Sequence, residues 1–381
     1  MKILHLITRG NGGGTEVSLT SNISFELTLG HEVLLVSSSD AIAKEIYKRK
    51  DEKFTFIKLE ELSKNSGLMQ KIKVYFQINS ILKSFAPDLL HTHETLAGIL
   101  GRMSKRNSHQ ISVHSVHMSL FCFEISYLQY WLYWLVEKIL SKYTDIYIFV
   151  GQEIMKQYKC LKLRARVGSF LVPSNINLDK FVIESQRKEQ NRTWIVDQSN
   201  LVVKSDTAIL VTVGMLERRK RQKLMISELA PLLKSNCVLI IVGEGENRTK
   251  LENFCKEIGV CDRVQFVGYS NKVERYIAGA DVLVHASTLE GLPQVLLQSV
   301  ACRTPAVCTR VMGSKELEDI YEIPRSGRKF RLKVEEILQG NSLNFSLDYS
   351  KWSSKNVEEA YSDVLRKIEH ISSSKSNRRK S

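Results

Sequence analysis

The sequence alternates short apolar runs with helical patterns, and this series starts twice along its 381 residues. Apolar runs bounded by turn residues are typical of strands buried on both faces of a parallel sheet. The first series begins at Lys2–Thr8 and the second at Ile209–Val213, after a polar stretch, Glu184–Asp206, that we interpret as a linker. Because strands alternating with helices form parallel sheets, the pattern predicts an α/β protein of two facing, doubly wound, Rossmann-like domains.

The best-defined strand end lies in the second series. The apolar run Ala280–Val284 precedes Glu290-Gly-Leu-Pro293, which leads into the helical pattern Gln294–Ala301. A helix that starts beyond a strand end offers free backbone N–H groups and a partial positive charge to an anion. Glu290 adds an acceptor for sugar hydroxyl groups, so this segment would suit a nucleotide sugar. Taken alone, Glu290 is explained equally well as a helix-entry acid favoured by the helix dipole.

Two other strand ends carry glycine. Gly13 and Gly14 belong to a glycine-rich turn after Lys2–Thr8, and Gly214 opens a loop that leads through Lys220 into a helix. In doubly wound domains, ligands sit beyond the carboxyl ends of strands. The spacing at Gly13 is not that of a dinucleotide fingerprint, and a glycine loop is a weak signal by itself. Lys220 lies in a basic run and would ordinarily be a solvated side chain.

Histidines cluster at strand ends of the first series. His91 and His93 alternate onto one strand face, which could suggest zinc. Since no third ligand is spaced to help, we expect no metal site. His5 is interpreted as a core residue, His114 as structural and His117 as functional.

Composition limits the partners and the compartment. A net charge of +14 favours anions, which include nucleotides, acidic glycans, anionic lipid surfaces and nucleic acid. No nucleic-acid-binding module is recognisable, so we expect no nucleic-acid partner. Seven cysteines without a CxxC pair favour a reducing compartment. The start reads as a strand rather than a signal peptide, and no apolar run reaches the roughly 20 residues of a membrane span. We therefore expect a cytoplasmic protein.

One predicted helix, Ser126–Lys142, is unusually aromatic. It holds two tryptophans and several tyrosines, followed by Lys138 and Lys142. Such a helix usually packs in a core, but aromatic side chains beside lysines are also typical of helices that lie in a membrane interface. Peripheral contact with the anionic inner face of a membrane therefore stays open as an alternative.

Several of these motifs, in their order along the chain, resemble one family. The segment from Glu290 to Gln298 resembles the E-x7-E segment of retaining GT-B glycosyltransferases of the family 4 type, also called group 1, with glutamine at the second position. The other similar motifs are Gly13-Gly-Thr-Glu16, His91-Thr-His93, Val116-His117, Asn175–Phe181, Gly214-x-Leu-x-x-x-Lys220 and Val242-Gly-Glu-Gly-Glu246. The likeness runs from residue 2 to about 310 and resumes weakly at Trp352.

The resemblance implies a GT-B fold with an acceptor domain at residues 1–183 and a nucleotide-sugar donor domain at 207–345. A C-terminal helix at 350–371 is expected to return to the first domain. The basic, serine-rich tail at 372–381 is predicted to be disordered.

The resemblance also implies a reaction. A sugar would move with retention from a UDP-sugar or GDP-sugar to a glycan or lipid-linked acceptor in cell-surface polysaccharide or lipopolysaccharide synthesis. The donor is a substrate, no cofactor is needed, and the absence of Asp-x-Asp fits a metal-independent enzyme. Lys220 would bind the leaving diphosphate together with backbone groups of Gly13, Gly14, Gly214, Gly291 and Leu292. Glu290 would hold donor hydroxyls, Gln298 the ribose and the Tyr269 main chain the base, with His117 beside the donor sugar.

Departures from the family pattern concern activity more than fold. Met215 stands where an arginine is usual, although Arg218, Arg219 or Arg221 could reach the same space. Gln298 can hydrogen-bond a ribose hydroxyl, but without the charge that strengthens such a bond, at a loss on the order of 1 kcal/mol. The alternative function is therefore a non-catalytic GT-B partner or regulatory subunit that binds a nucleotide sugar and barely turns it over.

Overall fold

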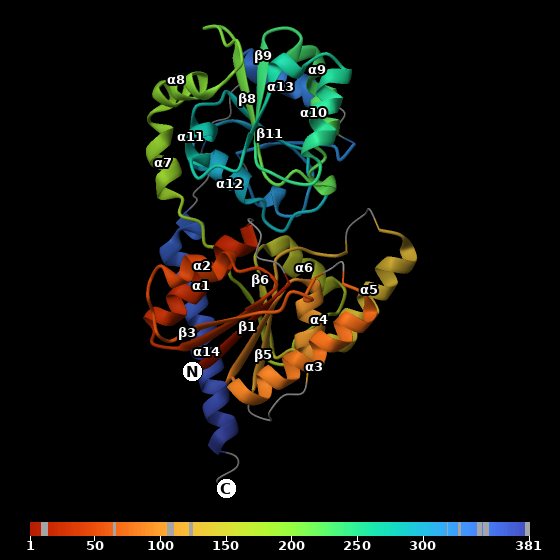
Figure 1. Ribbon diagram of the computed structural model, residues 1–381, viewed down its shortest axis with the longest axis vertical. Helices are drawn as coiled ribbons and strands as arrows, with labels where there is room; N and C mark the ends of the chain where they lie inside the picture. Colours follow the sequence, from red (N-terminus) through yellow and green to blue (C-terminus); the bar gives the residue numbers. More distant parts are fainter. Residues whose placement is uncertain are drawn as a thin grey trace. The chain divides into compact units, whose positions relative to one another are not determined.

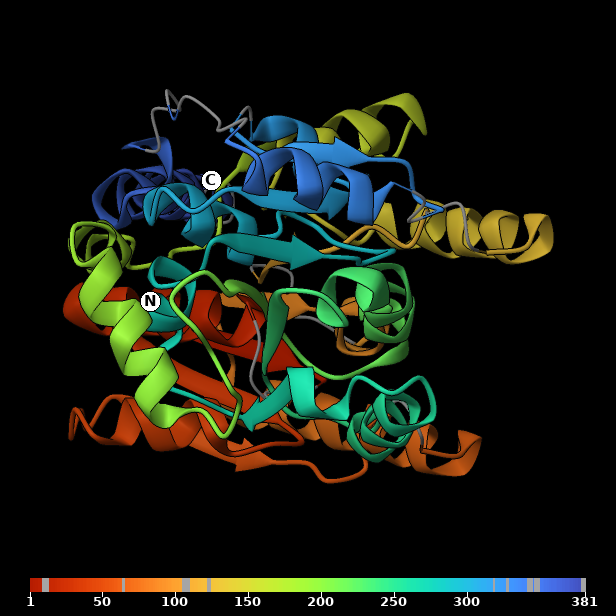
Figure 2. The same cartoon turned by 90° about the horizontal axis from the view of Figure 1, so that it is seen from above.

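The computed structural model describes residues 1–8, 14–63, 66–104, 110–121, 125–317, 319–326, 329–340, 345 and 350–377 (Figures 1 and 2). The chain divides into two compact units, Met1–Ile176 with Ser354–Ser381, and Asn177–Ser353. The chain therefore passes from the first unit to the second at residue 176, and not at the expected residue 183.

The N-terminal unit contains a parallel sheet of seven strands in the order β3-β2-β1-β4-β5-β6-β7. Its strands are β1 (Lys2–Ile7), β2 (Glu32–Ser37), β3 (Phe54–Lys58), β4 (Leu89–His93), β5 (Ile111–Val116), β6 (Ile146–Phe149) and β7 (Gly168–Leu171). Its helices are α1 (Gly14–Thr28), α2 (Ala41–Tyr47), α3 (Leu68–Phe85), α4 (Thr95–Met103), α5 (Tyr127–Ser141), α6 (Gln152–Cys160) and α14 (Ser354–Asn377). Because β2 and β4 lie on opposite sides of β1, the strand order reverses beside β1, where doubly wound folds bind ligands.

Helices cover both faces of this sheet. One face packs against α1, α2 and α14, and the other packs against α3 and α4 (Figure 1). Val357, Val364 and Ile368 of α14 are buried in the same cluster as strand residues such as Ile3 and Val33. The C-terminal helix thus supplies part of the core of the N-terminal unit. It continues to Asn377, so the segment predicted to be a disordered tail begins as helix.

The second unit contains a parallel sheet of six strands in the order β10-β9-β8-β11-β12-β13. Its strands are β8 (Ala208–Val213), β9 (Cys237–Val242), β10 (Val264–Gly268), β11 (Val282–His285), β12 (Ala306–Thr309) and β13 (Tyr321–Ile323). Its α-helices are α7 (Asp179–Ser185), α8 (Lys188–Gln198), α9 (Gln222–Leu233), α10 (Arg248–Glu257), α11 (Val273–Ala278), α12 (Gln294–Ala301) and α13 (Phe330–Leu338). The strand order reverses beside β8, as it does beside β1 in the first unit.

The expected linker at Glu184–Asp206 is wrong, because most of that stretch is helical and packed. Helices α7 and α8 lie against α11, and α7 also lies against α12. Ile195 is buried, the Trp194 ring meets the Tyr276 ring edge-on, and Arg192 Nη1 donates to Asp281 Oδ2 at 2.8 Å. A few apolar side chains are enough to pack one face of each helix. Because the rest of the segment is polar, its composition resembled that of a linker.

None of the helices in the described residues combines the length and the apolarity needed to cross a membrane. The longest, α14, has charged residues along much of its length.

Truncating the buried face of α14 should destabilise the N-terminal unit. We expect Ile368→Ala to lower the free energy of unfolding by about 2–5 kcal/mol, since the deleted groups leave a cavity in the core. Urea unfolding followed by circular dichroism measures this. The matched control is Lys367→Ala at the adjacent exposed position, for which we expect a change within about 0.5 kcal/mol. Equal effects of the two variants would contradict the packing of α14.

Candidate functional site

The loops that follow β8 and β11 meet at the carboxyl edge of the second sheet. After β8, the chain runs through Gly214 and Met215 to the 3-10 turn η1 (Arg218–Lys220), which leads into α9. After β11, it runs from His285 to Glu290 and then into α12. β8 and β11 are adjacent strands on the two sides of the order reversal. This edge is where the topology places a ligand.

The turn that follows β9 packs closely against the backbone of the first loop. Gly243 follows β9 with φ +143°, and its amide N donates to the carbonyl of Gly268 at 2.8 Å. A Cβ at residue 243 would lie 2.1 Å from the carbonyl oxygen of Gly214, which leaves no room for a side chain. The turn after β9 therefore supports Gly214 only because residue 243 is glycine.

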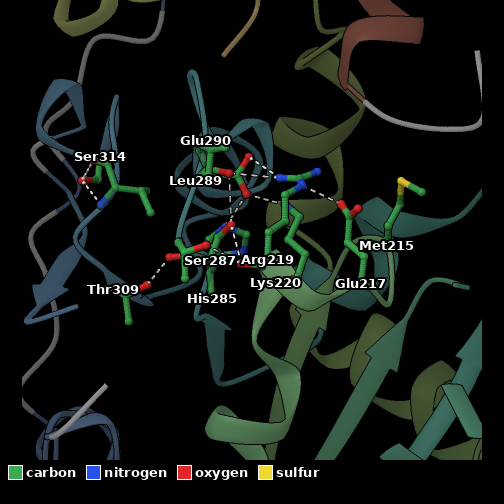
Figure 3. Close-up of polar contacts among 12 residues, drawn as sticks. Met215, Glu217, Arg219, Lys220, His285, Ser287, Leu289, Glu290, Thr309 and Ser314 are labelled. Atoms are coloured by element: carbon green, nitrogen blue, oxygen red, sulfur yellow. Dashed lines mark hydrogen bonds and ion pairs between the residues drawn. The ribbon is translucent and has the colours of Figure 1, made fainter. Parts of the chain in front are cut away.

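Glu290 lies among three basic side chains. Its Oε1 accepts from Lys220 Nζ at 2.5 Å and lies 3.2 Å from His285 Nε2, while its Oε2 lies 3.3 Å from Arg219 Nη1 (Figure 3). The Glu290 side chain is only 12% exposed and that of Lys220 only 14%. The predicted phosphate and sugar ligands, 70 residues apart in sequence, are thus brought into one partly buried ion pair.

Backbone contacts join the two loops independently of this ion pair. The amide of Thr288 donates to the carbonyl of Arg219 at 2.9 Å, and Arg219 Nη1 donates to the carbonyl of Leu289 at 3.1 Å. Arg219 also pairs with Glu217 at 2.6 Å (Figure 3). The Arg219 guanidinium therefore contacts Glu217 on its own loop and Leu289 and Glu290 on the other loop, and so helps to orient Glu290.

Burial and charge act in opposite directions on Glu290. Burial favours the neutral acid, but the positive charge of Lys220 and the hydrogen bond from His285 outweigh it and hold the pKa of Glu290 well below its usual range. Burial, followed by the charge of Lys220, lowers the pKa of His285. At neutral pH the site therefore holds an ionised carboxylate beside a neutral imidazole.

A neighbouring loop covers the segment that follows Glu290. Gly313 has φ +78°, and a Cβ there would lie 2.3 Å from the carbonyl oxygen of Gly291. The hydroxyl of Thr309, the last residue of β12, donates to the carbonyl of Ser287 at 2.7 Å (Figure 3). These contacts bury Gly291 and Leu292 and hold the approach to α12 in place.

Gln298 lies on α12, and its side chain is partly buried. Its amide makes no hydrogen bond to the residues that the structure describes. Tyr269 directly follows β10, and its side chain is 81% exposed. Both positions leave polar groups available to a ligand, and their assigned roles remain predictions.

The predicted site residues of the N-terminal unit lie at the carboxyl edge of its own sheet. His117 directly follows β5, Gly14 is the first residue of α1, and Gly13 lies outside the described residues. The expectation that no third ligand lies near His91 and His93 is wrong. His5, on the adjacent strand β1, has a ring nitrogen within 4.8 Å of ligand atoms of both. Strand pairing, which sequence spacing does not reveal, brings it there.

Sequence reasoning left His285 and Glu217 without a role and named Arg219 only as one of three arginines. In the structure Arg219 is the one that reaches Glu290, whereas Arg221 Nη1 donates to the carbonyl of Arg325 at 2.6 Å. Arg218 is exposed. A polar residue at the end of a buried strand, five positions before the glutamate, was the available signal for His285.

Removing the charge of Glu290 should destabilise the second unit. Breaking a buried ion pair costs about 3–5 kcal/mol, and the partial exposure here reduces our expectation for Glu290→Gln to about 2 kcal/mol at pH 7. Urea unfolding measures the change. Glu252→Gln, which breaks the pair with Arg248 whose side chains are 34% and 37% exposed, is the control and should cost less than about 1 kcal/mol.

The same comparison predicts a pH dependence. Because the pKa of Glu290 is lowered on folding, its stabilising effect is fully present above the ordinary value of 4.5 and is lost as the pH falls through the folded value. The difference in unfolding free energy between the wild type and Glu290→Gln should therefore stay constant from neutral pH down to 4.5 and shrink as the pH falls further toward the folded value. A difference that grew on acidification would contradict the assignment.

Comparison with known proteins agrees with this geometry. The family described as "Glycosyl transferases group 1" matches residues 196–330, and the family "Glycosyl transferase 4-like" matches residues 14–149. The putative glycosyltransferase EpsD of Bacillus subtilis is 28% identical over 258 residues, which span 65% of this chain and 65% of EpsD. An Escherichia coli relative, UDP-Gal:alpha-D-GlcNAc-diphosphoundecaprenol alpha-1,3-galactosyltransferase, is 23% identical over 66% of this chain and 65% of its own length.

Solved structures show the same fold. HepE of Anabaena, crystallised in complex with UDP-glucose, superposes with a TM-score of 0.66 at 17% identity, covering 99% of this chain and 100% of HepE. The matches to the curated relatives span just under two thirds of the length of each. The two family matches include the strand ends that carry Lys220 and Glu290 in one unit and His117 in the other. The chain therefore belongs to the group 1 glycosyltransferases, which have the GT-B fold.

Proposed function

We propose that this protein transfers a sugar, with retention and without a metal ion, from a nucleoside diphosphate sugar to a glycan or lipid-linked acceptor in cell-surface polysaccharide or lipopolysaccharide synthesis. The observation that carries the proposal is the Lys220–Glu290 pair at the carboxyl edge of the second sheet. The names of two relatives favour a uridine nucleotide, since the E. coli galactosyltransferase is named for UDP-Gal and HepE was crystallised with UDP-glucose. A GDP-sugar is the alternative donor.

The ion pair has the charges that such a donor requires. Lys220 and the amide groups in the first turn of α12 would neutralise the leaving diphosphate, since helix starts bind anions and preorganised cations stabilise developing charge. The Glu290 carboxylate can accept from sugar hydroxyls through lone pairs that Lys220 does not use. In the absence of a donor, Glu290 takes the place of the phosphate as the partner of Lys220. Donor binding would replace the Lys220–Glu290 contact with two others, one between Lys220 and the diphosphate and one between Glu290 and a sugar hydroxyl.

Gln298 would bind the ribose. It lies five residues after Pro293 on the axis of α12, and the helical rise puts it about 8 Å further along, a plausible distance between diphosphate and ribose. A neutral amide there makes a weaker hydrogen bond than a carboxylate would. We therefore expect the donor to bind more weakly than it would with a glutamate at residue 298. The contacts of Glu290 with the donor sugar should not be affected.

A non-catalytic partner or regulatory subunit remains the alternative function. Met215 and Gln298 favour it, but Arg219 supplies a guanidinium whose Nη1 lies 3.3 Å from Glu290 Oε2. Since the Lys220–Glu290 pair is present and oriented, we favour the enzyme.

Transfer should depend on both members of the pair. With a panel of UDP- and GDP-sugars and lipid-linked acceptors, we expect Glu290→Ala and Lys220→Ala each to reduce kcat/KM by about 100-fold or more, as for loss of a transition-state charge contact. Lys250→Ala, at an exposed position of α10, should have no effect. NMR of the product gives its anomeric configuration, and an inverted product would exclude retention. If neither site variant changed the activity, the non-catalytic function would replace this proposal.

A second glutamate should strengthen donor binding. We expect Gln298→Glu to lower the Kd of the nucleotide sugar about fivefold, since a charged acceptor adds on the order of 1 kcal/mol. Gln298→Ala should raise the Kd by a similar factor. Isothermal titration with the donor and with the free nucleoside diphosphate measures both. Unchanged affinity in the two variants would remove Gln298 from the donor site.

We further propose that α5 docks the protein on an anionic membrane surface. The core interpretation of this helix is wrong, because only Leu140 and Ser141 are buried on it. Tyr127 and Leu128 are 85% and 74% exposed, and Trp131 and Leu132 are about half exposed. The inner face is fixed to its own unit, since Trp134 Nε1 donates to the carbonyl of Leu161 at 3.1 Å. Exposed aromatic and apolar side chains on a basic protein suit a lipid interface, and the E. coli relative is named for an undecaprenol-linked substrate.

Charges on this face should prevent docking. In sedimentation with vesicles of phosphatidylglycerol and phosphatidylethanolamine, we expect the double variant Trp131→Glu, Leu132→Glu to bind at least about tenfold more weakly, because it loses apolar insertion and gains repulsion. The control carries the same added charge at exposed positions of the second unit, Gln198→Glu with Asn200→Glu. If both double variants lost the same affinity, general charge attraction would replace docking through α5.

A further inference from the structure

A row of hydrogen-bonded side chains runs through the interior of the N-terminal unit and ends at His117. Glu26 Oε2 of α1 lies 2.8 Å from His5 Nε2 of β1. His5 Nδ1 lies 3.1 Å from His93 Nε2 of β4, and His93 Nδ1 lies 3.0 Å from His117 Nε2, just beyond β5. Glu26, His5 and His93 are fully buried. The resemblance to the family gave a role only to the last member of this row, His117, beside the donor sugar.

Other side chains also contact the buried end of the row. The Tyr361 hydroxyl of α14 donates to Glu26 Oε1 at 2.5 Å, so both carboxylate oxygens have a donor. The same hydroxyl lies 3.4 Å from His91 Nδ1, and His91 Nε2 lies 2.7 Å from the hydroxyl of Ser115. A single assignment satisfies these contacts: His91 Nδ1–H donates to Tyr361, and its Nε2 accepts from Ser115.

The carboxylate gives the row a direction. A neutral imidazole has one donor and one acceptor nitrogen, and a carboxylate only accepts. A neutral His5 therefore donates to Glu26 from Nε2, and its Nδ1 accepts from His93 Nε2–H. His93 Nδ1 then accepts from His117 Nε2–H. By this alternation, the remaining nitrogen of His117, Nδ1, carries a lone pair and no proton.

The rings that follow His5 are neutral at pH 7. Burial, followed by the charges of neighbouring histidines, lowers the pKa of His93 well below its usual value, and burial lowers the pKa of His117 to about 4. Reversing the row would require an additional proton on His5, whose Nε2 faces Glu26.

The row ends at the Nδ1 atom of His117. His117 Nδ1 is buried and has no hydrogen-bond partner among the described residues. Buried polar atoms in folded proteins are nearly always paired, so an unpaired acceptor at a strand's carboxyl end points to a ligand that donates.

We propose that Glu26, acting through His5 and His93, holds His117 in the tautomer whose Nδ1 accepts a hydrogen bond from a hydroxyl group of the bound sugar substrate. This inference rests on the proposed function. Glu26, His5 and His93 are positioning residues, because they act through His117. Nucleotide sugars and glycans carry many hydroxyl donors, and an imidazole fixed as an acceptor selects a hydroxyl over a carbonyl or phosphate oxygen.

A metal site in the same cluster is the alternative use of these side chains. His5, His91 and His93 each offer a ligand atom, and these lie within 4.8 Å of one another. However, both nitrogens of each ring already face a hydrogen-bond partner, which a metal ion would have to displace. The row together with the contacts of His91 to Tyr361 and Ser115 accounts for every ring nitrogen of the cluster, and a metal site accounts for none of these contacts.

The tautomer can be observed directly in the full-length protein. In 15N-histidine NMR spectra, with His117 assigned by the loss of its signals in His117→Gln, we expect a protonated Nε2 and an unprotonated Nδ1. Adding the nucleotide sugar, or the acceptor, should shift the Nδ1 resonance. A protonated Nδ1 in the wild-type protein would overturn the proposal, whether or not any variant folds. So would one zinc ion per chain in elemental analysis that is lost in His91→Asn.

Glu26→Gln tests the origin of the tautomer. The amide can donate as well as accept, so the row can reverse, and both tautomers of His117 should appear. We expect kcat/KM to fall about five- to tenfold, as for one misdirected hydrogen bond, and no further loss when Glu26→Gln is added to His117→Gln. Tyr361→Phe is the matched control: it removes a bond to the same carboxylate and leaves the tautomer and kcat/KM unchanged. A loss that adds fully to that of His117→Gln would indicate a merely structural Glu26 and overturn the proposal.

These outcomes separate the inference from the proposed function. If no donor is turned over but the Glu26-dependent tautomer is observed, the transferase proposal fails while the positioning row stands. If transfer occurs and neither substrate shifts the His117 resonance, the transferase proposal stands and the inference fails.

Discussion

Both units depend on one constraint, which is that all the paired strands of their sheets are parallel. Parallel strands need crossover connections, so the end of each strand and the start of the next helix come to one edge. Beside β1 and β8 the strand order reverses, and strands distant in sequence become neighbours. This pairing brings the Lys220 loop to the Glu290 loop, and His5 to His93.

Each unit also holds a buried carboxylate at this edge or beneath it. A carboxylate removed from water is costly unless charges or donors compensate it. Glu290 is compensated by Lys220, Arg219 and His285, and Glu26 by His5 and Tyr361. The first arrangement supplies cations and a hydroxyl acceptor on one loop pair. The second sets the direction of the hydrogen bonds along a row of imidazole rings. Two carboxylates that are both compensated by neighbouring donors thus have different roles.

Much of the fold and part of the site could be predicted from sequence. Apolar runs and glycine turns predicted the strands, and the order of motifs indicated the family, because both signals are local. The helices α7 and α8 were interpreted as a linker, since their burial depends on contacts with α11 and α12 that a polar composition does not reveal. The prediction for the aromatic helix α5 was wrong for the opposite reason. Its apolar side chains predicted a core position, yet several of the large ones are half exposed or more.

The sequence by itself determined the two-domain α/β class and the family, and it predicted Glu290 and Lys220 as site residues, because these inferences follow from residue types at short spacings. Only the tertiary structure decided which arginine reaches Glu290, that His285 shares its site, and that His5 joins His93 and His117. Those facts depend on strand pairing and loop contact between residues far apart in the chain. Hydrogen-bond direction in particular belongs to a complete network, which no local pattern contains.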